Sequence, residues 1–113
     1  PGRTAQKLDR YLSEQHRDNR GDGCIVAAMA SEIARLNGPV RDRFDETVSG
    51  MVNALTHALP SQCPDGEDQR QRALATMATM VGGLIIARAV ADEALSQEVL
   101  GAARAAIRHQ TGI

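Results

Sequence analysis

The fold is decided by residues 73–91, which read ALATMATMVGGLIIARAVA. This stretch is uncharged except for Arg88, and two adjacent glycines, Gly82 and Gly83, lie in its middle. A glycine inside a helix costs about 1 kcal/mol relative to alanine, so a pair of them indicates that another backbone packs closely there. The uncharged run before Arg88 is shorter than the about 20 apolar residues that span a bilayer, which favours a buried helix.

On a helical wheel the stretch has two apolar faces. One face carries large side chains and is expected to pack into the core: Leu74, Met77, Val81, Leu84, Ile85 and Arg88. The opposite face is a nearly flat stripe with a spacing of four, made of Ala75, Thr79, Gly83 and Ala87. One small domain has few elements left to cover both faces, and a large exposed apolar patch usually marks an interface. The alternative is a monomer in which the preceding helices wrap this one entirely.

A second copy of the chain is the expected cover for the flat stripe. Together with the last helical segment, this helix would form a four-helix bundle between two subunits about a twofold axis. The predicted dimer interface consists of Ala75, Thr76, Thr79, Gly83, Ile86, Ala87, Val90, Val99, Ala103 and Ile107.

The remaining chain also has helical periodicity, and no segment alternates as a strand would. The sequence therefore predicts a single all-α domain over residues 1–113, with five helices near residues 4–19, 24–36, 40–59, 67–91 and 96–110. The third is the clearest, because its large apolar residues recur at spacings of three and four from Val40 to Leu59. Pro39 is expected in its first turn, whereas Asp22 and Ser96 are expected to cap the second and fifth helices.

Composition argues against nucleic-acid binding by this chain alone. The formal net charge is −1, and no basic face is implied. The early basic residues are interleaved with acidic ones, which predicts a solvated surface: Arg3, Lys7, Arg10, Arg17 and Arg20. Aromatic residues make up only 2% of the chain, so the core must be aliphatic.

Catalysis and metal binding find little support in the motifs. Cys24 and Cys63 are far apart and match no metal or redox spacing, and Cys24 is expected to be a small core residue. The three histidines lie in polar contexts on different segments, and the sequence contains no glycine-rich phosphate loop. We therefore expect no catalytic residue, metal or cofactor, although a small all-α enzyme remains an alternative. Because no secretory signal is evident, a reducing cytoplasm is the expected location.

The sequence supports a ligand-binding cavity better than a catalytic or metal site. Methionine is adaptable and polarizable, and four methionines on different helices can line a pocket for varied apolar ligands. Either Glu32 or Arg88 could supply a polar group there; otherwise Glu32 lies on the surface, and Arg88 extends outward or pairs with Asp92. The predicted ligand-binding residues are Tyr11, Met29, Glu32, Phe44, Met51, Leu55, Met77 and Met80.

Three stretches together resemble a known family. They are DGCIVAAMASEIAR (22–35), PVRDRF (39–44) and RQRALATMATMVGGLIIARAVADEALSQEVLGAAR (70–104). Their order and spacing, over about residues 8–107, resemble the C-terminal regulatory domain of TetR-type transcriptional regulators. No single motif carries the resemblance alone.

The resemblance implies a ligand-sensing and dimerisation domain of a transcriptional repressor. In that family an N-terminal helix-turn-helix domain, missing from this sequence, reads operator DNA, and the C-terminal domain binds a small effector and dimerises through its last two helices. The implied partners are a second copy, a small apolar effector in a cavity among the first four helical segments, and operator DNA only through the missing domain. The identity of the effector and the regulated genes stay open, and a dimeric scaffold without a ligand is the alternative.

Overall fold

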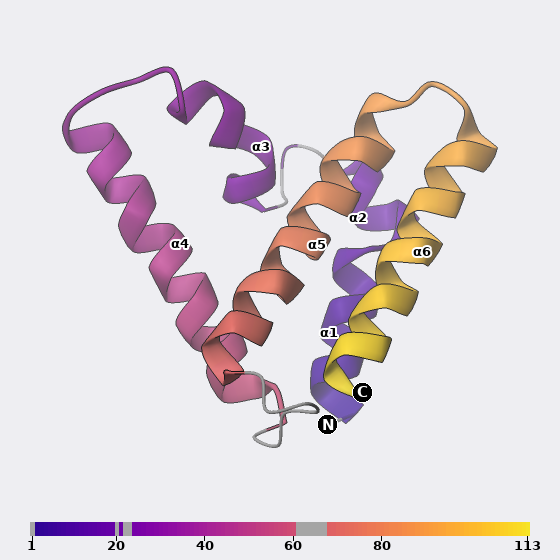
Figure 1. The fold of residues 1–113 in the computed structure, drawn as a ribbon. Coiled ribbons are helices and arrows are strands. Elements are labelled where there is room, and N and C mark those ends of the chain that lie inside the picture. Colours follow the sequence, from indigo (N-terminus) through magenta and orange to yellow (C-terminus); the bar gives the residue numbers. More distant parts are fainter. Residues whose placement is uncertain (1, 20, 22–23, 61–67) are drawn as a thin grey trace.

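The computed structural model describes residues 2–19, 21, 24–60 and 68–113, which form helices and no strand. Figure 1 shows the six helices in chain order: α1 (Gly2–Tyr11), α2 (Glu14–Asp18), α3 (Ile25–Ile33), α4 (Pro39–Ala58), α5 (Gln69–Ala89) and α6 (Glu93–Thr111). The all-α class is confirmed. The predicted count of five differs because the first predicted helix is divided into α1 and α2.

Ser13 causes this division. Its hydroxyl donates to the carbonyl oxygen of Arg10 at 2.6 Å and accepts from the backbone N–H of His16 at 3.2 Å. The same side chain therefore closes α1 and caps the N-terminus of α2. Serine competes with the backbone for hydrogen bonds in this way, which favours it at caps over helix interiors.

The caps of the later helices follow the sequence in part. Pro39 stands in the first turn of α4, as predicted, after Gly38, whose φ of +83° few other residues adopt. The predicted cap of the last helix is wrong, because Asp92 caps α6 and accepts from the backbone N–H of Leu95 at 3.0 Å. Ser96 instead lies inside α6, buried, and donates to the carbonyl oxygen of Ala87 at 2.7 Å. The expected cap at Asp22 lies outside the described residues.

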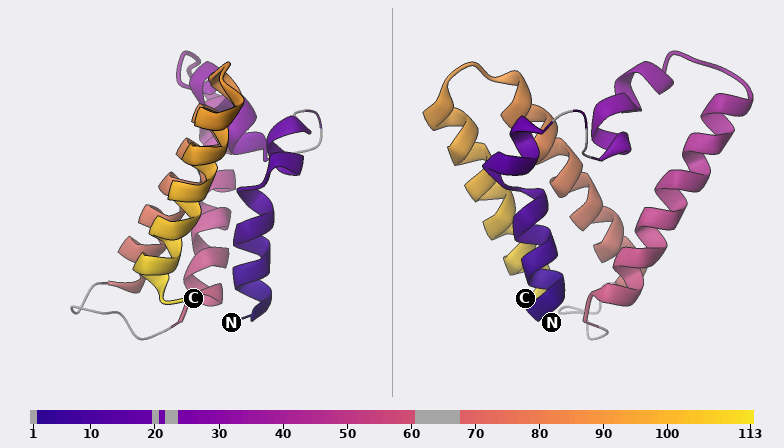
Figure 2. Two further views of the ribbon diagram at one scale, coloured as in Figure 1. Left: turned by 90° about the vertical axis from the view of Figure 1, so that its right-hand side faces the viewer. Right: turned by 180° about the vertical axis from the view of Figure 1, so that it is seen from behind.

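The helices are arranged around α5. α6 runs antiparallel beside it, whereas α4 meets α5 at one end and diverges from it, and α3 lies between their separated ends (Figure 1). The view from behind shows α1 and α2 lying across α5 and α6, with both ends of the chain close together at the same end of the molecule (Figure 2). We call residues 2–18, which comprise α1 and α2, the arm.

The buried face of α5 differs from the predicted one. It consists of Arg72, Ala73, Thr76, Met80, Gly83, Leu84 and Ala87. Leu74 and Ile85, which were expected in the core, are 39% and 38% exposed. A Cβ atom added to Gly83 would lie 2.9 Å from the Cβ of Ala103 on α6 and 3.2 Å from Cδ2 of Leu12, which directly follows α1. Because Gly83 has no side chain, α5, α6 and the arm can pack closely within one chain, and this packing buries much of the small-residue stripe.

Length and hydropathy alone would also allow α5 to span a membrane, and within the described part of the chain it is the only helix of that kind. Seven of its residues are buried between neighbouring helices. This burial matches the predicted role as a core helix, since a central helix is apolar on most of its faces.

Candidate functional site

A groove lies at the junction of α1 and α2. Its volume is about 380 Å³, and it is lined by Lys7, Arg10, Tyr11, Ser13, Gln15, His16 and Asn19. Small-molecule sites commonly have volumes of about 300–1,000 Å³. We call it the arm groove.

Tyr11 and His16 form the inner wall of the arm groove. Their rings meet edge to face, with centroids 4.6 Å apart. The imidazole Nδ1 lies 2.7 Å from the carbonyl oxygen of Tyr11, and Nε2 lies 3.3 Å from the backbone nitrogen of Cys24. Because a carbonyl can only accept and a backbone N–H can only donate, this geometry assigns a neutral imidazole with its hydrogen on Nδ1. His16 therefore links the arm to the start of α3.

The hydroxyl group of Tyr11 is buried beside the thiol of Cys24. Burial raises the pKa of the Tyr11 phenol above its usual range; the neighbouring Cys24 thiol adds to the rise, and the positive charge of Arg88 opposes it. The phenol is neutral near pH 7, and its hydroxyl group is buried and not exposed in the arm groove.

Arg88 connects α5 to α2 through two hydrogen bonds. Its Nε donates to the carbonyl oxygen of Arg17 at 3.0 Å, and its Nη2 donates to that of His16 at 2.9 Å. The sequence expected Arg88 to extend outward, to pair with Asp92, or to enter a pocket. The structure places it half-buried between α5 and α2, where it also borders a second groove of about 320 Å³ with Ala27, Ala28, Ile85 and Ala89.

Arg17 connects α2 to the turn between α5 and α6. Its side chain is only 9% exposed; Nη1 donates to the Ser96 hydroxyl at 2.9 Å and lies 3.0 Å from a Glu93 carboxylate oxygen. The adjacent Asp18 carboxylate, 2.9 Å from Nε, is the main reason that the pKa of Arg17 is raised; Glu93 adds to the rise, and desolvation opposes it. The prediction of a solvated surface position is wrong for Arg17. Sequence reasoning missed it because Ser96 lies 79 residues away along the chain.

The predicted ligand-binding residues occupy four different places. Tyr11 lies in the arm groove, while Phe44 borders a separate groove with Ile25, Ile33 and Val40, between α3 and the start of α4. Met29 and Glu32 are exposed on α3. The remaining four belong to the apolar core or pack against it: Met51, Leu55, Met77 and Met80. The structure thus brings only Tyr11 to the arm groove, and a single cavity shared by the whole set is not formed.

The predicted dimer residues separate into two groups. Five are buried within the single chain: Thr76, Gly83, Ala87, Ala103 and Ile107. The other five are half-buried or exposed: Ala75, Thr79, Ile86, Val90 and Val99. A partner subunit can touch only the second group directly.

The half-buried and exposed members of the predicted dimer set belong to a larger apolar surface on α5 and α6. On α5 the positions 75, 79, 82 and 86 share one side, and on α6 the positions 95, 99, 102 and 106 repeat the same spacing. Ile86 is 51% exposed and Leu95 43% exposed. Arg104 and Arg108, which reach α1, lie on the opposite side of α6. We call this surface the outer face; it comprises Ala75, Thr79, Gly82, Ile86, Leu95, Val99, Ala102 and Ala106.

Residues 1–100 match the family model described as "Transcriptional regulator LmrA/YxaF-like, C-terminal domain". The chain therefore belongs to this family of TetR-type C-terminal domains, as the sequence resemblance implied. Comparison with curated proteins found no match.

Proposed function

We propose that this chain is the effector-sensing and dimerisation domain of a cytoplasmic transcriptional repressor. Its partners are a second copy of itself, a small effector, and operator DNA through a helix-turn-helix domain that precedes it. The observation that carries the proposal is the outer face, because an apolar surface extending over two long helices is unusual for a monomer.

A twofold axis through the outer face would pack α5 and α6 against the same pair of a second copy, giving a four-helix bundle. Gly82 supports this arrangement. A Cβ atom added to it would meet nothing within 4 Å in its own chain, so this glycine has no packing role within the subunit. A small residue on the outer face lets a partner helix pack closely.

The arm supports the sensing role. It carries the groove, and Arg17 and Arg88 attach it to the α5–α6 pair. A ligand in the arm groove would thereby favour one position of the arm relative to the dimer helices, and a preceding DNA-reading domain would move with α1. Such a population shift requires the ligand to bind the two positions with different affinities. Because two DNA readers must match half-sites about one helical turn apart, a change in their spacing releases the operator.

Sedimentation velocity tests the dimer. We expect the wild-type chain to sediment as a dimer, and Ile86→Glu to sediment as a monomer because it places a charge in the apolar interface. Ile25→Glu is the matched control: Ile25 is 60% exposed on α3, away from the outer face, so this variant should stay dimeric. A monomeric wild type at micromolar concentration, or an equal loss of dimer in both variants, would overturn the proposal.

A further inference from the structure

The charges around the arm groove distinguish it from the rest of the surface. Lys7 and Arg10, three residues apart on α1, both border it, and no Asp or Glu is among the described residues that line it. Asp9, the acidic residue between them, pairs instead with Arg108 on α6 at 2.7 Å. Neither Lys7 nor Arg10 forms an ion pair with a described residue. The groove therefore presents two positive charges in a chain whose net charge is −1.

His16 adds no charge of its own, because its two ring nitrogens are engaged as donor and acceptor in the neutral form. Its ring and that of Tyr11, which meet edge to face, instead supply an apolar wall with an angle between its two rings. The carbon stems of Lys7 and Arg10 extend this apolar surface, since such side chains cover apolar area while their charged ends stay in water. Gln15, Asn19 and Ser13 offer neutral hydrogen-bonding groups at the edge of the groove.

From this arrangement we propose that the arm groove binds organic anions: compounds with an apolar body that lies on Tyr11 and one carboxylate that faces Lys7 and Arg10. This inference rests on the proposed sensing function and specifies the ligand class. It departs from the neutral apolar effector that the sequence indicated, because the aliphatic residues predicted to hold such a compound lie mostly in the core. The anion neutralises charges that have no ion-pair partner among the described residues, and the apolar body removes ring surface from water.

The chain provides its own probe for this site. Tyr11 is its only tyrosine and it contains no tryptophan, so the intrinsic fluorescence of the protein reports on the arm groove alone. Octanoate and octanamide are a suitable pair of ligands, since they match in length and differ in charge. We expect octanoate to change the Tyr11 fluorescence saturably and to bind about five- to tenfold more tightly than octanamide. Added salt should weaken octanoate binding more than octanamide binding.

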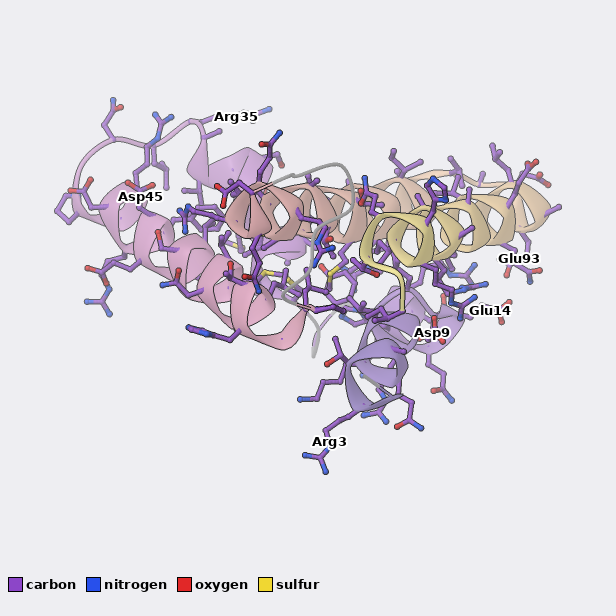
Figure 3. All side chains as sticks on the ribbon, turned by 60° about the horizontal axis from the view of Figure 1, so that its bottom comes forward. Arg3, Asp9, Glu14, Arg35, Asp45 and Glu93 are labelled. Carbon is purple, nitrogen blue, oxygen red and sulfur yellow. The ribbon has the colours of Figure 1, made fainter. Side chains whose placement is uncertain are left out.

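The matched variants are a double substitution, Lys7→Gln with Arg10→Gln, and the single substitution Arg3→Gln. Arg3 lies on the same helix but does not line the groove, and it projects away from the helical bundle in Figure 3. The double variant should lose the preference for octanoate, and Arg3→Gln should keep it. Far-ultraviolet circular dichroism and sedimentation would confirm that both variants remain folded and have the wild-type oligomeric state.

Three results would overturn the anion proposal: equal affinity for the two ligands, no saturable fluorescence change with either, or an unchanged preference in the double variant. Equal saturable binding of both ligands would leave the sensing function intact while refuting the ligand class. Conversely, a wild-type chain that prefers octanoate to octanamide but sediments as a monomer would support the anion site and refute the dimeric regulator. Failure of the ligand class and failure of the dimer are therefore distinguishable.

Discussion

The two adjacent glycines in α5 face different surroundings, and replacing each with alanine should have opposite effects. Gly83→Ala places a Cβ atom 2.9 Å from the Cβ of Ala103 and 3.2 Å from the end of the Leu12 side chain. A separation below 3 Å between two carbon atoms forces α5 and α6 apart. Overpacking of this kind costs about 1–3 kcal/mol. The change also removes a glycine from a helix, which contributes about 1 kcal/mol of stabilisation. The net expectation is a loss of about 1 kcal/mol.

Gly82→Ala is the control, because the same substitution one position earlier meets no atom within 4 Å. Within one subunit only the helix-propensity gain remains, so at protein concentrations where the chain is monomeric this variant should be more stable than the wild type by about 0.5–1 kcal/mol. In a domain of this size, about 1 kcal/mol corresponds to about 4 °C in Tm. Gly83→Ala should therefore melt several degrees below the wild type, and Gly82→Ala a few degrees above it.

Thermal unfolding followed by far-ultraviolet circular dichroism measures both values. The melts should be run at two protein concentrations, because a dimer couples Tm to concentration. If Gly82 faces a partner subunit, the benefit of its replacement should shrink or reverse at the higher concentration, where the dimer is more populated. A Gly83→Ala variant as stable as Gly82→Ala would refute the close packing of α5 and α6 as the reason for the second glycine.

Three further expectations concern single side chains. The folded-state pKa of Tyr11 is raised above the unfolded value of 10.0, so the contribution of the neutral phenol to stability is fully present below about pH 10 and is lost as the pH rises further. Urea unfolding should show this loss of stability in the wild type and not in Tyr11→Phe. An equal loss in both proteins would contradict the assignment to Tyr11. Arg17→Met should speed hydrogen exchange of the Ser96 amide by about tenfold or more, since the buried hydrogen bond to the Ser96 hydroxyl disappears; unchanged exchange would show that the contact does not hold the turn. Arg108→Gln should cost less than about 1 kcal/mol, because its ion pair with Asp9 is exposed and screened by salt; a larger loss in urea unfolding that persists in high salt would argue against this.

Local signals in the sequence predicted much of the fold. The spacing of apolar residues located α4, and Pro39 marked its start, because both depend on neighbours within a few turns. The division at Ser13 was missed, since a serine with no acidic residue three positions later gives only a weak start signal. The helical wheel assigned the faces of α5 only in part: Leu84 is buried as expected, whereas Leu74 and Ile85 are exposed. It could not show that Leu12 and Ala103 cover Gly83, because that depends on how distant helices pack.

The candidate site was less predictable than the fold. Tyr11 was expected to contact a ligand and does border the arm groove, but its neighbour His16 was noted only as a histidine in a polar context. His16 acquires its role by accepting a hydrogen bond from the backbone N–H of Cys24, and a backbone donor leaves no trace in residue type. The same holds for Arg88, whose acceptors are the carbonyl oxygens of two residues more than seventy positions away.

Three of the hydrogen bonds that attach the arm to the rest of the domain are accepted by its own backbone. Arg88 binds the carbonyl oxygens of His16 and Arg17, and Arg104 binds that of Leu12 at 2.5 Å. Every amino acid supplies a carbonyl oxygen, so these anchors tolerate almost any change of the outward-pointing side chains. Natural selection, or an engineer seeking a biosensor for a new compound, could therefore substitute the exposed side chains of the arm while its hydrogen bonds to α5 and α6 are retained.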